Sequence, residues 1–115
     1  MATSPSPEAQ LPLSPTVFAI LLALSTGDKH GYAIMKEAAE PEGGSIRLGP
    51  GTLYGSLDRM VRDGLVEETG FTDDARRRYY RISSLGHRVF SAEFARITSI
   101  VAAVNNREFP KGARA

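Results

Sequence analysis

Apolar residues recur with helical spacing in four stretches of the chain. The first stretch, 15–24, is apolar on nearly every side, so we expect a helix there that is buried all round. Ser14 is placed to cap this helix, and Pro15 suits its first position. A second stripe, over 30–40, predicts a shorter helix, and we expect His30 to cap or pack its start.

The third apolar stripe begins after Gly49 and Pro50, which suit an N-cap and a first helical position. Apolar residues at i, i+4, i+7 and i+8 predict its buried face, made of Leu53, Leu57, Met60 and Val61. The opposite face is expected to carry Thr52, Ser56, Arg59 and Asp63. Gly64 is expected to end the helix.

Two later stretches, 65–70 and 78–84, have the alternation of β-strands, and the residues between them, 71–77, predict a projecting loop. The two faces of the second strand should carry Tyr80 and Ile82 and, opposite them, Tyr79 and Arg81. A short strand is also expected at 45–48.

The fourth apolar stretch, 85–105, predicts a long C-terminal helix capped by Ser83 or Ser84. Its apolar residues are spaced 4, 3, 4, 3, the spacing of a heptad seam formed by Phe90, Phe94, Ile97, Val101 and Val104. The ends of the chain, 1–12 and 106–115, are polar or rich in Pro and Ser, and they predict a disordered N-terminal tail and a polar C-terminal tail.

The expected order of elements is helix, helix, short strand, helix, strand, strand, helix. Two short helices before a third, followed by a hairpin, is the order of a winged helix-turn-helix. We therefore expect a mainly α fold with a small β-hairpin. Residues 13–84 would form the winged helix-turn-helix, and residues 85–105 would form a separate C-terminal helix.

The net charge of +1 conceals an uneven distribution. Residues 1–75 carry 5 Lys and Arg against 11 Asp and Glu, a balance of −6, whereas residues 76–115 carry 9 against 2, a balance of +7. This asymmetry indicates one basic surface that meets a polyanion. The alternative is that the charges only solvate the surface.

Composition argues against several other classes of protein. The chain has no cysteine, hence no disulfide or thiolate metal site, and we expect no metal and no cofactor. Its longest apolar run, 17–24, is far shorter than the roughly 20 residues of a membrane span and follows no basic leader, so we expect a cytoplasmic protein. His30 and His87 are far apart and lack a carboxylate relay, and GPG at 49–51 is not a phosphate loop, so no catalytic residue is predicted.

The stretch 49–60, GPGTLYGSLDRM, begins a helix with glycines that each weaken it by about 1 kcal/mol. We interpret Gly51 and Gly55 as positions that let this helix approach DNA closely. The side chains offered to phosphates or base edges are then Thr52, Tyr54, Ser56 and Arg59. Alternatively, the glycines allow tight packing of helices, and Tyr54 is a core aromatic residue with a solvated hydroxyl.

The stretch 75–81, ARRRYYR, places three arginines at the mouth of the hairpin. Because strand side chains alternate, Arg76 and Arg78 should point one way and Arg77 the other. In a wing beside a recognition helix, arginines suit the phosphates that flank the groove. The alternative is a solubilising charge run that the acidic residues at 73–74 partly neutralise.

Three segments resemble the PadR family of bacterial transcriptional regulators: HGYAIM at 30–35, GPGTLYGSLDRMVRDGLVE at 49–67 and RRRYYRISSLGHRVF at 76–90. The resemblance implies a winged helix-turn-helix repressor of double-stranded, palindromic operator DNA. It also implies a homodimer held by the C-terminal helix, with the heptad seam as its contact. Carried over by position, it implies DNA contacts by Gly51, Thr52, Tyr54, Arg76, Arg77 and Arg78.

The family usually has a serine where this chain has Gly49 and a proline where it has Gly55. Some members respond to phenolic acids or to several drugs, so a small-molecule effector that releases DNA stays open. The alternative function is a winged-helix module that binds protein and not DNA. Such a module has no need of the three wing arginines.

Overall fold

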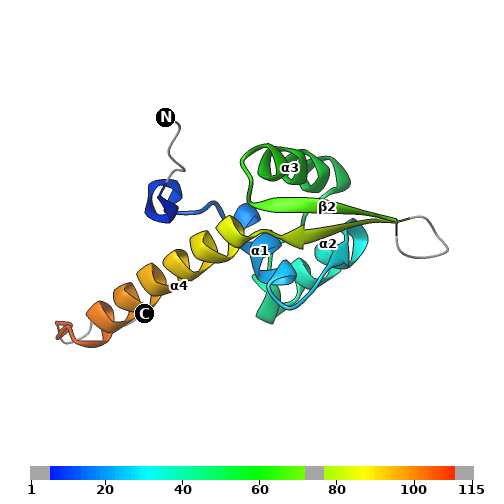
Figure 1. Ribbon diagram of the computed structural model, residues 1–115. Helices are drawn as coiled ribbons and strands as arrows, with labels where there is room; N and C mark the ends of the chain where they lie inside the picture. Colours follow the sequence, from blue (N-terminus) through cyan, green and yellow to red (C-terminus); the bar gives the residue numbers. More distant parts are fainter. Residues whose placement is uncertain (1–5, 72–76, 111–115) are drawn as a thin grey trace.

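The computed structural model describes residues 6–71 and 77–110. Its elements are η1 (Pro7–Gln10), α1 (Pro15–Leu24), β1 (Lys29–His30), α2 (Gly31–Ala39), η2 (Pro41–Gly43), α3 (Pro50–Arg62), β2 (Val66–Phe71), β3 (Arg78–Ile82) and α4 (Ser84–Asn105). The strands form one antiparallel sheet in the order β1-β3-β2, and α4 extends away from the other elements (Figure 1). The predicted mainly α fold with a small hairpin is confirmed.

Helix α1 is the centre of the core. Its start is capped as predicted, because the Ser14 hydroxyl accepts a hydrogen bond from the Val17 amide at 3.2 Å and Pro15 occupies the first position. The helix contacts α2, α3, α4 and β3. Its buried residues are Ala19, Ile20, Leu21, Ala23 and Leu24. Because an apolar helix of this kind is unfavourable in water, the other elements pack around it.

The faces of β3 are as predicted. Tyr80 and Ile82 are buried, and they lie opposite Glu68 and Val66 of β2 in the antiparallel register. Arg81 points the other way and is exposed. Burial raises the pKa of the Tyr80 hydroxyl above its ordinary value, with a further contribution from the charge of Glu68.

The expectation of a short strand at 45–48 is wrong. The chain leaves η2 through Gly44 and Ser45, whose φ angles of +115° and +55° lie in the left-handed region. The Ile46 amide then donates to the carbonyl of Ala38 near the end of α2 at 2.8 Å, so this segment is bonded to a helix end. The third strand is β1, which directly precedes α2.

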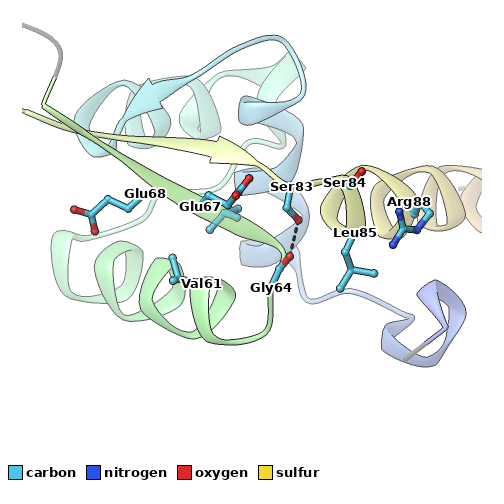
Figure 2. A pocket seen from close by; sticks show the side chains of 9 residues that line it. Val61, Gly64, Glu67, Glu68, Ser83, Ser84, Leu85 and Arg88 are labelled. Carbon is cyan, nitrogen blue, oxygen red and sulfur yellow. Dashed lines mark hydrogen bonds between the residues drawn. The ribbon is translucent and has the colours of Figure 1, made fainter. Parts of the chain in front are cut away.

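Ser83 joins three elements at the base of the hairpin. Its hydroxyl donates to the carbonyl of Gly64, just after α3, at 2.5 Å (Figure 2). The same hydroxyl accepts from the amide of Gly86, in the first turn of α4, at 2.9 Å. Gly86 lies so close to the carbonyl of Leu65 that a Cβ atom there would overlap it. The predicted Ser83 cap is confirmed, and it helps to fix where α4 begins.

Part of the segment expected to be a disordered tail, 1–12, is ordered. Residues 7–10 form η1, which packs on α4. The amide of Leu13 donates to the carboxylate of Glu93 on α4 at 3.0 Å. Glu93 is buried and also accepts hydrogen bonds from Arg96. A buried carboxylate 80 residues away therefore holds the chain that follows η1.

The predicted heptad seam of α4 divides into two parts. The ring of Phe90 is half-buried, and its centroid lies 5.5 Å from that of Phe18 on α1, so Phe90 belongs to the core of its own chain. The outer members of the seam are half-buried or exposed: Phe94, Ile97, Val101 and Val104. Phe94 is the most exposed of these four residues, at 64%. The outer part of α4 thus presents an apolar face.

Glu93 makes the stability of the fold dependent on pH. Hydrogen bonds from Arg96, and then from the Leu13 amide, hold the pKa of Glu93 below its ordinary value against the opposing effect of burial. Because the folded-state pKa is the lower one, this contribution is fully present above the unfolded pKa of about 4.3. It is lost as the pH falls through the folded-state pKa.

Glu93→Gln should therefore lower the free energy of unfolding by about 1–3 kcal/mol at neutral pH. The difference from the wild type should shrink as the pH falls below about 4. Urea unfolding across this pH range measures both effects. Glu108→Gln, at an exposed position, is the control and should change little. A deficit of constant size at every pH would contradict the role assigned to Glu93.

Candidate nucleic-acid interface

The N-terminal end of α3 is open to solvent. Gly49 is the N-cap and makes no side-chain capping bond, so the amides of Gly51 and Thr52 have no capping acceptor. A Cβ atom built on Gly49, Gly51 or Gly55 would meet no atom within 4 Å. The interpretation that these glycines allow tight helix packing is therefore wrong, because they lie on the surface.

Tyr54 links α3 to the start of α2. Its ring lies directly over Gly31, and a Cβ atom there would overlap the Tyr54 hydroxyl and ring. The side chain of Tyr54 is nevertheless 42% exposed, so the interpretation of Tyr54 as a core residue is wrong. Gly31 is buried by this contact, and only a residue without a side chain leaves the tyrosine ring in place.

The buried face of α3 differs from the prediction at two positions. Leu53, Leu57 and Met60 are buried, but Val61 is 40% exposed and lies toward a groove beside β2. Ser56, predicted on the outward face, is only 2% exposed because it falls between the buried positions on the helix surface. Arg59 is exposed, and its Nη2 donates to the Ser56 hydroxyl at 3.4 Å. Because Ser56 is buried, the prediction that it contacts DNA is wrong.

His30 lies between α2 and the wing. Its Nδ1 accepts a hydrogen bond from the Ala33 amide at 3.2 Å, which confirms the prediction that His30 caps α2. The imidazole contacts Tyr79 of β3 edge to face, with the ring centroids 5.4 Å apart, and stacks near Tyr32 at 6.5 Å. The other ring nitrogen, Nε2, lies 3.0 Å from Nη1 of Arg77.

The two described wing arginines extend in different directions, as strand alternation predicts. Arg77 reaches His30, whereas Nε of Arg78 lies 3.4 Å from a carboxylate oxygen of Glu68 on β2. Both arginine side chains are exposed. Arg76 and most of the predicted loop at 71–77 lie outside the described residues.

Three sequence motifs therefore meet on one surface. Tyr54 covers Gly31, Gly31 follows His30, and His30 touches Arg77. We call this the α3–wing surface, formed by Gly51, Thr52, Tyr54, His30 and Arg77. DNA contacts are predicted from the sequence for all of these residues except His30. The sequence signal for His30 is its position next to Gly31 in the HGY motif. That position points to the surface only once Tyr54 is known to lie on Gly31.

Residues 20–92 match the model of the family described as "Transcriptional regulator PadR-like family". The chain belongs to this family. A protein of Lysinibacillus sphaericus is 30% identical over 87 residues, which cover 71% of this chain and 80% of that protein. A 37.1 kDa protein in transposon TN4556 of Streptomyces fradiae is 36% identical over 74 residues, 64% of this chain but 20% of the transposon protein.

Solved structures share the fold of this PadR-like chain. A PadR family transcription regulator from Clostridium difficile is similar with a TM-score of 0.71, at 25% identity, over 80% of this chain and 96% of that one. Bacillus subtilis PadR, solved in complex with operator DNA, has a TM-score of 0.60 at 16% identity, over 90% of this chain and 54% of that one. At that identity the second comparison shows the fold alone.

A groove of the PadR-like chain lies elsewhere, between the end of α3, β2 and the start of α4 (Figure 2). This shallow groove of about 700 Å³ is lined in part by apolar Val61 and Leu85. Its charged residues are Glu67, Glu68 and Arg88, and Figure 2 shows both glutamates along β2, away from Arg88. The two glutamates disfavour the binding of a polyanion in this groove. The α3–wing surface is therefore the better candidate for binding DNA.

Two other kinds of site, a metal centre and a membrane-spanning helix, find no support in the part of the chain that the structure describes. There, no group of three or more His, Asp and Glu side chains is placed to hold a metal ion. Across residues 6–71 and 77–110, no helix has the length and apolar character needed to cross a membrane. The α3–wing surface instead offers hydrogen-bond donors and the guanidinium of Arg77.

Two glycine substitutions test the surface position of α3. Gly55→Ala should raise the free energy of unfolding by up to about 1 kcal/mol, because the new methyl group meets no atom and alanine favours a helix. Gly86→Ala, also in a helix, should lower it by about 1–3 kcal/mol, because its methyl group overlaps the Leu65 carbonyl. Thermal unfolding of both variants checks this, and a loss of stability in Gly55→Ala would place Gly55 in a packed site.

Proposed function

We propose that this PadR-like protein is a repressor that binds double-stranded operator DNA as a homodimer, through the α3–wing surface. One observation carries the proposal: the open N-terminal end of α3 lies near Arg77 of the wing. The two are linked because Tyr54 of α3 contacts Gly31, and the preceding residue, His30, contacts Arg77. In a winged helix-turn-helix, these two elements are the ones that meet the major groove and its flanking backbone.

The chemistry of the α3 end suits DNA. The amides of Gly51 and Thr52 and the positive end of the helix dipole favour a phosphate group. Residues Thr52 and Tyr54 are exposed, and their hydroxyl groups are the kind of donor that binds phosphates or base edges. Gly51 and Gly55 keep the helix surface low, so the backbone approaches the groove closely. Arg59 extends the same exposed side of the helix.

The wing arginines are assigned to backbone phosphates. Arg77 and Arg78 are exposed at the base of the wing, where guanidinium groups match the oxygens of a phosphate. We extend this role to Arg76 on the resemblance of the RRRYY run alone. Phosphate contacts fix the position of the protein on the duplex and carry no sequence information, so base reading falls to α3.

The homodimer is assigned to the outer part of α4. Burying an apolar side chain there gains roughly 1.5–3 kcal/mol, and Phe94, Ile97, Val101 and Val104 are available for such contacts. Association costs an estimated 4–15 kcal/mol, so this seam is of marginal strength by itself. The neighbouring Phe18 of α1 is half-buried and can extend the contact. Two-fold symmetry then calls for a palindromic operator.

Repression and release by an effector follow from the resemblance to the family. A bound dimer represses when its operator overlaps a promoter. A small molecule that alters how two α4 helices pack would change the spacing of the two α3 helices, and hence the affinity for a palindrome.

Arg77→Ala should weaken the binding of mixed-sequence duplexes about equally. The slope of log K against log salt should fall in magnitude by about 0.9 for each lost phosphate contact, and a dimer loses two. Fluorescence anisotropy at several salt concentrations measures the slope, with Arg107→Ala beyond α4 as the control. Absence of duplex binding by the wild type, at low salt, would instead favour a winged-helix module that binds protein.

The double variant Val101→Glu, Val104→Glu should be a folded monomer. Both side chains are exposed in the single chain, so the charges leave its core intact but repel across the proposed seam. Sedimentation velocity measures the mass, and circular dichroism checks the fold. Ser99→Glu, on the same helix but off the seam, should remain a dimer. A dimeric double variant would move the interface away from α4.

A further inference from the structure

Ser83 makes three hydrogen bonds where the end of α3, the hairpin and the start of α4 meet. Its amide donates to the Leu65 carbonyl at 3.0 Å, and its hydroxyl donates to the Gly64 carbonyl at 2.5 Å (Figure 2). The same hydroxyl accepts from the Gly86 amide at 2.9 Å. One residue therefore binds both the chain that leaves α3 and the first turn of α4.

The partners of Ser83 are themselves fixed. Gly64 ends α3 with a φ of +79°, in the left-handed region. The Leu65 amide then donates to the Met60 carbonyl of α3 at 2.9 Å. On the other side, Gly86 is buried so close to the Leu65 carbonyl that a Cβ atom would overlap it. This junction therefore leaves α4 little freedom to tilt relative to α3.

Helix α4 is also attached to the core at a second place, which is apolar. The rings of Phe18 on α1 and Phe90 on α4 lie 5.5 Å apart between centroids. Hydrophobic contacts have no preferred direction, whereas a hydrogen bond weakens as its angle departs from linear. The angle at which α4 leaves the winged domain is thus set more sharply by the bonds of Ser83 than by the contact of the two rings.

Any tilt at the junction is amplified along α4. The helix has 22 residues and is about 33 Å long at about 1.5 Å per residue. Over that length, a tilt of about 6° displaces one end by about 3.4 Å, which is the rise of one base pair. In the proposed dimer the outer turns of α4 are held by the second copy, so the tilt moves α3. The distance between the two α3 helices then depends on the junction.

We propose that Ser83 is a positioning residue that sets which spacing of operator half-sites the dimer accepts. The inference rests on the proposed function, because it concerns where each chain of the dimer places its α3. The spacing of half-sites follows from the distance between the two recognition helices. Ser83 acts through α3 and α4, without touching the DNA.

A set of serine substitutions separates this role from stability. Ser83→Ala removes both bonds of the hydroxyl, whereas Ser83→Thr keeps a hydroxyl group. Ser83→Gly also removes both bonds, but glycine is well tolerated as an N-cap, so this variant is used if the alanine variant does not fold. Ser84→Ala is the matched control, since Ser84 is exposed and makes no hydrogen bond of its side chain within the described residues.

The probe is a palindromic duplex that the wild type selects from random sequences, together with versions that have one or two base pairs more or fewer at the centre. Fluorescence anisotropy measures the affinity for each. The wild type should bind the altered spacings at least about tenfold more weakly than the original. For Ser83→Ala, this ratio should fall below about threefold, because a looser junction accommodates more spacings. Ser83→Thr and Ser84→Ala should keep the wild-type ratio.

A second measurement needs no DNA. The chain has no cysteine, so Asp58→Cys, at an exposed position of α3, gives each dimer a single pair of spin labels. Double electron–electron resonance then measures the distribution of distances between the two α3 helices. Ser83→Ala should broaden this distribution, whereas Ser84→Ala should leave it as in the wild type.

A Ser83→Ala dimer whose label distances match those of the wild type would overturn the proposal. So would an equal fold loss of affinity for every spacing, which is what a purely structural role of Ser83 produces. Both results leave the proposed function standing. A wild type that is monomeric, or that selects no palindromic duplex, would instead reject the proposed function, and the spacing role of Ser83 with it.

Discussion

The whole fold depends on the burial of one short helix. Helix α1 is apolar on nearly every side, so it is stable only where other elements surround it. Helices α2, α3 and α4 and strand β3 all contact it. Polar and basic residues are left for the periphery, at the start of α3, at the base of the wing and along α4. The functional surfaces are thus placed by a core that takes no part in their chemistry.

Around that core, the α3–wing surface depends on the absence of a side chain at Gly31. Gly31 lets the Tyr54 ring lie on the start of α2, and the next residue back, His30, reaches the wing through Tyr79 and Arg77. The HGY and GTLY motifs therefore form one structural unit, although they lie some 20 residues apart in the chain. A glycine that appears to be a weak point of a helix is a contact surface for a tyrosine.

Local features of this structure could be predicted from the sequence, and features that depend on distant partners could not. The caps by Ser14 and Ser83 and the alternation of β3 follow from neighbouring residues. The burial of Ser56 was missed because a hydroxyl was assumed to face solvent, although its helix position lies on the apolar stripe. Residues 7–10 form a 3-10 helix that packs on α4, and the buried Glu93 of α4 binds the Leu13 amide that follows. The composition of the tail reveals neither contact. Strand β1 has only two residues, too few for alternation to reveal.

The outer turns of α4 carry a consequence for how the protein works in a cell. Every residue from Thr98 to Asn105 is exposed in the single chain, and a helix without packing partners is marginal in water. In the proposed dimer, the second copy supplies that packing, so association of the chains stabilises these turns. While dimers are scarce, the amount of DNA-competent protein rises with the square of its total concentration. A modest change in the synthesis rate or gene dosage of the protein then produces a larger change in operator occupancy, and hence in expression of the controlled genes.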